Sequence, residues 1–170
     1  MKKNVFIFGL VLGTLLCVNL FYMVHLCYKE ASLKGNDVLG YSIMVVVFSL
    51  TYFGIRNYRD KELNGEISFG RAFKTGALIA FAGSTIYVVV WLFYYYLFVP
   101  DFMERYAYHM LRDVPPADLA EKTKEIDDFK EMYKNPLFVV LFTYVEVLPV
   151  GLLVSFVSAF TVKRKAKIHK

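Results

Sequence analysis

Four long apolar runs divide this chain and limit what it can fold into. They cover residues 5–28, 38–55, 76–99 and 137–162. A helix crosses the hydrocarbon core of a bilayer in roughly 20 residues, so each run is long enough to span a membrane. Backbone groups in lipid must be hydrogen-bonded within the protein, and a helix achieves this by itself. The sequence therefore predicts an all-α fold, a bundle of four transmembrane helices in a single domain over residues 1–170.

The composition and charge of the chain agree with a membrane location. Apolar residues make up 57% of it and the mean hydropathy is +0.44, more than a soluble core of this size needs. The net charge is +5, but the Lys and Arg residues bracket the apolar runs, as they do in membrane proteins. We therefore expect the lipid bilayer, and not nucleic acid, as the partner.

The distribution of Lys and Arg predicts how the chain crosses the membrane. Residues 1–4, 56–75 and 163–170 together hold twelve Lys/Arg and three acids, whereas residues 29–37 and 100–136 hold eight Lys/Arg and eleven acids. Cytoplasmic segments carry the excess of Lys and Arg. We expect a multi-pass protein of the bacterial inner membrane with both termini in the cytoplasm. Its first apolar run is long for a signal peptide and is expected to be retained as a span.

The outer segment 100–136 contains an amphipathic stretch between the third and fourth spans. Asp118 followed by Glu121 has the spacing of a capping box at the start of a helix. Apolar residues then recur at helical spacing, with charges between them, at Leu119, Ile126, Phe129 and Tyr133. We expect an extracytoplasmic amphipathic helical insert. Its apolar stripe lies on the outer leaflet or on the bundle, as a lid or as a spacer.

Small residues recur at four-residue spacing in three of the spans. They are Gly9 and Gly13, then Gly76, Ala80 and Ser84, then Gly151, Ser155 and Ala159. This spacing lets helix backbones approach closely. The predicted topology puts all three sets in the cytoplasmic half of the membrane and the bulky side chains in the outer half. We expect a bundle that is tight at its cytoplasmic side and looser toward the outside.

Glu146 is the one acidic residue within the four apolar runs. It lies nine residues into the fourth run, roughly 14 Å from the outer end and near the membrane midplane. A charge there costs at least ~2.5–3.5 kcal/mol, so Glu146 should face the bundle and be paired or protonated. Pro149 removes a backbone donor one turn later and marks a kink. The polar groups expected near this depth are Asn19, Tyr22, Ser84 and Tyr87.

The sequence leaves two interpretations of Glu146 open. In the first, it is a proton or cation site, or a point that holds a cationic ligand. In the second, it is a neutral carboxyl group that is hydrogen-bonded to a neighbouring helix and fixes the helix register. A Glu146→Gln protein that folds but loses pH-dependent behaviour would support the first interpretation.

The polar link between the second and third spans, residues 56–75, carries turn and capping signals. Asn64-Gly65 is a turn signal, and Ser68 is the expected N-cap of a third helix that starts near Phe69. Five basic residues flank this turn, namely Arg56, Arg59, Lys61, Arg71 and Lys74. They fit contact with anionic lipid headgroups or with a partner protein. Simple anchoring of the topology, with the charged ends of the side chains reaching the membrane surface, also explains these basic residues by itself.

Signatures of catalysis and of cofactor binding are missing from the sequence. His25, His109 and His169 are dispersed, with no Cys or carboxylate at metal-ligand spacing. No glycine-rich loop that cradles phosphate occurs. Cys17 and Cys27 are about 15 Å apart along one helix, beyond disulfide reach. We expect no catalytic residue, metal or cofactor, and a protein that is not an enzyme.

Several short motifs carry a resemblance to a known family. In chain order they are Gly54-Ile55-Arg56, Tyr58-Arg59-Asp60-Lys61, Asn64-Gly65, Ile67-Ser68-Phe69, Tyr133-Lys134-Asn135-Pro136 and Glu146 with Pro149-Val150-Gly151. In this order and spacing, nearly the whole chain resembles the bacterial membrane family catalogued as domain of unknown function 4199. The resemblance implies a four-span inner-membrane protein. It supplies no catalytic residue, cofactor or substrate.

Three functions fit the sequence. The first is a non-enzymatic accessory or structural membrane protein that contacts a second copy or another membrane protein. The second is a small transporter or ligand-binding bundle centred on Glu146, and transport would require an oligomer because four spans leave little room for alternating access. The third is a protein that contacts anionic lipids through the basic link. A cavity that reaches Glu146 would favour the second function, and a solid core with a lipid-facing stripe of small residues would favour the first.

Overall fold

The computed structural model describes residues 1–29 and 36–164, and in this part of the chain every regular element is a helix. The helices are α1 (Lys2–Lys29), α2 (Asn36–Phe48), α3 (Leu50–Glu62), α4 (Phe69–Phe98), α5 (Phe102–Arg112), α6 (Leu119–Tyr133) and α7 (Pro136–Val162). The predicted all-α fold is confirmed. Residues 30–35 and 165–170, which contribute to the Lys and Arg counts that predict the topology, lie outside the described residues.

Four helical segments are long and apolar enough to cross a membrane, as predicted. They are Lys2–Lys29, Val38–Glu62, Phe69–Phe98 and Pro136–Val162. The second segment joins α2 to α3 through Ser49, whose hydroxyl donates to the carbonyl of Val46 at 2.5 Å. A hydroxyl that bonds to the preceding turn competes with the regular helix bonds. This competition accounts for the interruption between α2 and α3.

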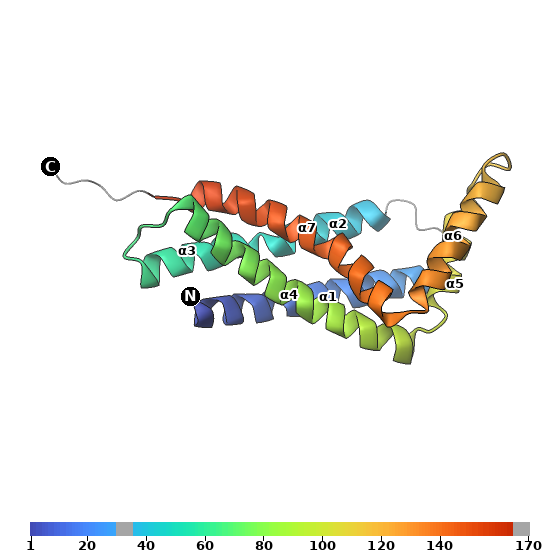
Figure 1. Ribbon diagram of the computed structural model, residues 1–170, viewed down its shortest axis with the longest axis horizontal. Helices are drawn as coiled ribbons and strands as arrows, with labels where there is room; N and C mark the ends of the chain where they lie inside the picture. Colours follow the sequence, from blue (N-terminus) through green and yellow to red (C-terminus); the bar gives the residue numbers. More distant parts are fainter. Residues whose placement is uncertain (30–35, 165–170) are drawn as a thin grey trace.

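α4 is the central helix and packs against both α1 and α7 (Figure 1). The contact with α1 is close because glycines of α1 face side chains of α4. A Cβ atom on Gly9 would lie 2.7 Å from the Cβ of Ala82, and one on Gly13 would lie 2.8 Å from the Cβ of Ile86. Real Cβ atoms do not approach so closely, so both positions require glycine. The close packing expected from the small-residue spacing is confirmed for α1.

The bundle has two different ends. The start of α1, the end of α7 and the turn between α3 and α4 lie together at one end, here called the termini end (Figure 1). Gly76 of α4 meets α7 in this half, where an added Cβ would lie 3.0 Å from the Cβ of Ser155. The opposite end carries α5 and α6 and is here called the insert end (Figure 1). It contains the cavity described below, whereas the close glycine contacts lie toward the termini end; the contrast between a tight cytoplasmic side and a looser outer side stays a prediction.

The turn at the termini end follows the sequence signals. Asn64 and Gly65 have φ angles of 52° and 86°, in the left-handed region that an Asn-Gly turn uses. α4 begins at Phe69, and the Ser68 hydroxyl oxygen accepts a hydrogen bond from the N–H of Arg71 at 3.4 Å. The predicted turn and the predicted N-cap are both confirmed.

The insert consists of two helices, α5 and α6, of which the sequence predicted only the second. α6 begins at Leu119 as expected, but the Asp118 side chain makes no capping hydrogen bond with any described residue. The predicted capping box is therefore wrong. Asp118 has helical backbone angles, with φ −102° and ψ −7°, whereas a capping side chain requires an extended backbone at this position.

Candidate functional site

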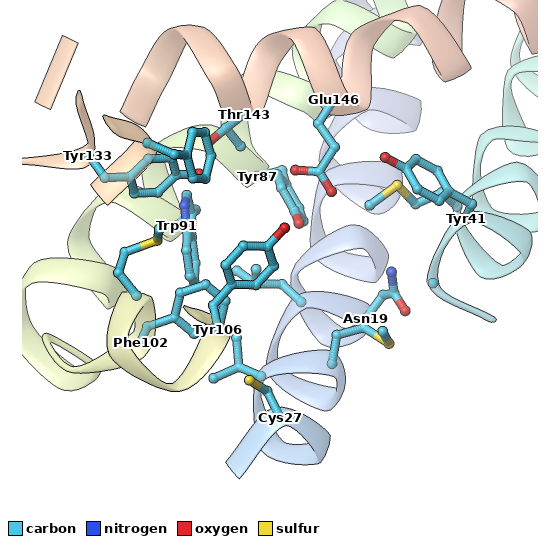
Figure 2. Close-up of a pocket in the computed structure, with 17 residues that line it drawn as sticks. Asn19, Cys27, Tyr41, Tyr87, Trp91, Phe102, Tyr106, Tyr133, Thr143 and Glu146 are labelled. Atoms are coloured by element: carbon cyan, nitrogen blue, oxygen red, sulfur yellow. The ribbon is translucent and has the colours of Figure 1, made fainter. Parts of the chain in front are cut away.

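A cavity of about 370 Å³ lies among α1, α2, α4, α5, α6 and α7. We call it the Glu146 cavity, because the side chain of Glu146 points into it (Figure 2). Small-molecule sites in proteins have volumes of roughly 300–1,000 Å³, so the cavity has the size of a small ligand site. Seven aromatic side chains make up much of its wall, namely Tyr41, Tyr87, Trp91, Phe102, Tyr106, Phe129 and Tyr133.

Glu146 reaches the cavity because of where α7 begins. The Asn135 side chain accepts a hydrogen bond from the N–H of Leu137 at 3.0 Å and caps the helix. Pro136 occupies the first helical position, which needs no backbone donor. Glu146 follows ten residues later, about 15 Å along the helix, and shares a helix face with Thr143. Both residues line the cavity, so a carboxylate stands deep within a membrane-spanning helix and beside open space.

Tyrosine hydroxyl groups surround the same space as the Glu146 carboxylate. The hydroxyl groups of Tyr87 and Tyr106 point into the cavity beside it (Figure 2). Burial raises the pKa of the Tyr133 hydroxyl, and the charge of Glu146 raises it further. Tyr133 is therefore protonated at physiological pH and available as a hydrogen-bond donor.

Asn19 is the most unusual polar residue of the cavity wall. Its side chain lies on α1 and is only 4% exposed. Among the residues that the structure describes, neither the amide nitrogen nor the amide oxygen of Asn19 has a hydrogen-bond partner. A buried polar group left without a partner costs about 1–3 kcal/mol. Water or a bound molecule in the cavity would supply the missing hydrogen bonds.

The exposed part of the cavity lining lies on α2 and α7. Of its lining residues, only Tyr41 on α2 and Glu146 on α7 are exposed, and the rest are buried or half-buried. Figure 2 shows these two side chains next to each other at one edge of the cavity. Both residues belong to segments that are long and apolar enough to span a membrane, so we infer that the cavity is open on the side of the bundle between α2 and α7.

Comparison with known proteins identifies the family. A family model described as protein of unknown function (DUF4199) matches residues 6–164, nearly the whole chain. The chain belongs to the DUF4199 family. This confirms the resemblance seen in the sequence motifs. No curated protein and no solved structure matches this DUF4199 protein. Every residue that lines the Glu146 cavity lies within the matched range.

The structure brings together three of the five residues predicted for a polar site in this DUF4199 protein. Glu146, Asn19 and Tyr87 all line the cavity. Tyr22 lies on the outer face of α1 and is 47% exposed, and it is not part of the lining. Pro149 is exposed on α7, one turn beyond Glu146, and also lies outside the lining.

The insert supplies cavity residues that sequence reasoning missed. Tyr106 comes from α5, the helix that was not predicted. The helical spacing of the apolar residues Phe102, Met103, Tyr106 and Ala107 could have indicated α5. Phe129 and Tyr133 belong to the predicted stripe of α6, which packs toward the bundle and forms part of the cavity wall. The insert of the DUF4199 protein therefore completes the site.

The five basic residues of the link have different surroundings. Arg56, Lys61, Arg71 and Lys74 are exposed at the termini end. Arg59 is 9% exposed, and its guanidinium donates to the carbonyl of Val162 at 3.0 Å and to the carboxylate of Asp60 at 2.7 Å. Four of these residues are thus exposed, while Arg59 joins α3 to the end of α7.

A second, polar cavity of about 380 Å³ lies at the insert end, next to the first. In it the Tyr28 hydroxyl donates to Asp101 at 2.5 Å, and the Arg105 guanidinium donates to Asp101 at 2.8 Å. These two hydrogen bonds hold the pKa of Asp101 below its ordinary value of 3.8, and the bond from Tyr28 has the larger effect. Cys27 lines both cavities. Within the described residues, no group of three or more His, Cys, Asp or Glu side chains can hold a metal ion.

Proposed function

We propose that this DUF4199 protein is a non-enzymatic membrane protein that binds a small molecule in the Glu146 cavity. One observation carries this proposal: the Glu146 carboxylate and the Asn19 amide, both polar groups inside spans, line one open cavity. A carboxylate in hydrocarbon costs at least ~2.5–3.5 kcal/mol. Such a residue is tolerated beside water or a bound polar group, and intramembrane ionisable residues commonly mark binding sites.

The packing of small residues favours ligand binding over a purely accessory role. An accessory protein that acts through its helices would present small residues to the lipid. In this bundle Gly9, Gly13 and Gly76 instead contact neighbouring helices of the same chain. The close helix contacts are therefore used within the protein, and the open space is concentrated around Glu146.

The proposal includes a location and an orientation. We place the protein in the bacterial inner membrane with both termini in the cytoplasm, supported by the excess of Lys and Arg in residues 1–4, 56–75 and 163–170. The insert is then extracytoplasmic, and the cavity mouth between α2 and α7 faces the outer half of the bilayer. A ligand would reach it from that side.

Contact with anionic lipids is a second role, at the opposite end of the protein. The observation that favours it is the set of four exposed cations around the turn between α3 and α4, namely Arg56, Lys61, Arg71 and Lys74. Basic residues at the cytoplasmic surface attract anionic headgroups, by about 1 kcal/mol each. This role concerns the surrounding bilayer and is independent of the cavity.

The fluorescence of Trp91 tests the proposed binding function. Trp91 is the one tryptophan of the chain and lines the cavity. The full-length protein in lipid vesicles is titrated with small cationic, neutral and anionic compounds. We expect at least one compound to change the emission in a saturable way. If the emission stays constant throughout the panel, the binding function is wrong.

A matched pair of variants shows whether such a signal comes from the cavity. A Cβ on Gly40 would lie 3.2 Å from the flexible end of Met23, so Gly40→Leu adds a side chain to the cavity wall. A Cβ on Gly70 meets nothing within 4 Å, and Gly70→Leu is the control. The saturable change should be lost in Gly40→Leu and retained in Gly70→Leu.

A further inference from the structure

The Glu146 cavity also indicates the chemical class of its ligand. We propose that it binds an organic cation, whose ammonium group is held between the Glu146 carboxylate and the aromatic wall. This inference rests on the proposed binding function and adds the ligand class to it.

The charge of the cavity wall selects a cation. Among the described residues that line the cavity, Glu146 is the only carboxylate, and Lys, Arg and His are absent. A negatively charged ligand would be repelled by the Glu146 carboxylate, and none of these lining residues carries a positive charge to offset the repulsion. A positively charged ligand neutralises the carboxylate and reduces the cost of keeping it in the membrane.

The aromatic wall provides a second attraction for positive charge. Figure 2 shows Trp91, Tyr133 and Phe102 grouped on one side of the cavity, across from Tyr41. The ring centroids of Trp91 and Phe102 are 5.0 Å apart, and those of Phe129 and Tyr133 are 4.7 Å apart. Tyr106 joins the two pairs, with its ring centroid 6.3 Å from that of Phe102 and 6.4 Å from that of Phe129. The face of an aromatic ring attracts an ammonium group, most strongly where water is excluded.

The same wall does not suit a metal ion. A hard metal cation such as Ca²⁺ or Mg²⁺ is usually held by six or more oxygen ligands with carboxylates among them, whereas this cavity offers one carboxylate beside neutral hydroxyl and amide groups. Aromatic rings and methionine side chains, among them Met23, Met44 and Met103, cannot replace those oxygens. They do accommodate the alkyl groups of an organic ammonium ion. A volume of about 370 Å³ leaves room for such an ion with an apolar body.

Asn19 supplies a contact for the rest of the ligand. Its amide nitrogen and oxygen are buried at the cavity wall and have no hydrogen-bond partner among the described residues. Figure 2 places Asn19 on α1, apart from Glu146 on α7. A cation that also carries a hydroxyl or carbonyl group could therefore contact both residues. The geometry therefore fits an amphipathic organic cation that enters from the membrane side.

Titration of Trp91 fluorescence with a pair of matched probes tests the charge requirement. Choline carries a trimethylammonium group, and 3,3-dimethylbutan-1-ol has the same shape with carbon in place of the nitrogen. We expect choline to produce a saturable change in the full-length protein in vesicles. The neutral alcohol should bind at least about tenfold more weakly, because it lacks the attraction to Glu146 and to the rings.

Two variants test whether the preference for choline over the neutral alcohol depends on Glu146. Glu146→Gln keeps the shape of the side chain and should weaken choline binding at least about tenfold, and it should weaken binding of the alcohol much less. Glu131→Gln makes the same substitution on α6, at an exposed residue that pairs with Lys134 outside the cavity, and should change neither. If Glu146→Gln does not fold, the comparison of the two probes on the wild-type protein still tests whether the ligand must be a cation.

The outcomes separate the ligand class from the binding function. Equal affinity for choline and the neutral alcohol, or an unchanged choline affinity in Glu146→Gln, would overturn the cation proposal and leave binding in the cavity intact. Absence of any choline response, with a saturable response to a neutral or anionic compound, would also overturn the cation proposal alone. No response to any compound would overturn both.

Discussion

The guanidinium of Arg59, near the end of α3, donates a hydrogen bond of 3.0 Å to the backbone carbonyl of Val162, the last residue of α7. The carbonyls in the last turn of a helix have no partner within the helix. Arg59 satisfies one of them from another span. Two backbone hydrogen bonds between Ile67 and Arg164, of 3.1 and 3.0 Å, likewise join the turn after α3 to the residues that follow α7. The termini end is thus held together by polar contacts that are buried or partly buried.

Replacement of Arg59 should therefore destabilise the protein. Arg59→Met removes a charged donor from a buried carbonyl, and we expect a loss of about 1.5–3 kcal/mol in the free energy of unfolding. Arg56→Met removes an exposed arginine three residues away and is the control, with an expected change below about 0.5 kcal/mol. Chemical unfolding in detergent micelles measures both. Equal effects of the two substitutions would contradict the role of Arg59 in joining α3 to α7.

The contact between α1 and α4 predicts a different result for two glycines. In Gly9→Ala the new methyl group would lie 2.7 Å from the Cβ of Ala82, which cannot move without its helix. We expect a loss of about 1–3 kcal/mol from overpacking. Gly70→Ala places a methyl group in open space and should be neutral or stabilise α4 by up to about 1 kcal/mol. Thermal unfolding of the two variants provides the comparison, and a Gly9→Ala protein as stable as wild type would rule out the close approach.

Asp101 makes stability depend on pH at the insert end. Its pKa is lowered in the folded protein by the hydrogen bonds from Tyr28 and Arg105, so the unfolded chain binds the proton more readily. The stabilising contribution is complete above the ordinary value of 3.8 and is lost as the pH falls through the lower folded-state pKa. Asp101→Asn should reduce the unfolding temperature at pH 6 and remove part of its decline below pH 4. Asp127→Asn, at an exposed position of α6, is the control and should leave the pH profile of wild type unchanged.

The exposed cations of the termini end predict a dependence on anionic lipid. The protein should unfold at a higher temperature in vesicles that contain phosphatidylglycerol than in purely zwitterionic vesicles. Each cation contributes about 1 kcal/mol to headgroup attraction, so the difference should shrink strongly when Arg56, Lys61, Arg71 and Lys74 are all replaced by Gln. The control replaces the four lysines of the insert, Lys122, Lys124, Lys130 and Lys134. An equal loss in the control would show a general charge effect without a headgroup site.

The spans and part of the site were predictable because they follow from short-range rules. Run length and hydropathy identify the four spans, and the rise of 1.5 Å per residue places Glu146, Asn19 and Tyr87 at similar depth. Tyr22 shares that depth but lies on the outer face of α1. A helix that is apolar all round gives no signal of which face is buried, so depth alone could not separate Tyr22 from Asn19.

The cavity itself depends on long-range packing, which the sequence does not reveal. Tyr106 reaches it only because α5 folds back against the bundle, and Tyr41 only because α2 packs between α1 and α7. The capping box at Asp118 failed for a local reason, since the backbone there is already helical. The polar residues of the site were thus visible in the sequence, whereas most of the aromatic wall that surrounds them was not.

The reactivity of Cys27 tests the cation-binding cavity most directly. Cys27 lines the cavity, whereas Cys17 is buried outside it and serves as an internal control. The protein in vesicles is treated with 2-(trimethylammonium)ethyl methanethiosulfonate or with its anionic 2-sulfonatoethyl counterpart, and intact mass follows the modification. Relative to free cysteine, the cationic reagent should modify Cys27 at least about tenfold faster than the anionic one. Glu146→Gln should reduce this preference, because it leaves only the charged groups of the second cavity, which Cys27 also lines. Equal relative rates for the two reagents, or an undiminished preference in Glu146→Gln, would contradict the cation-binding cavity.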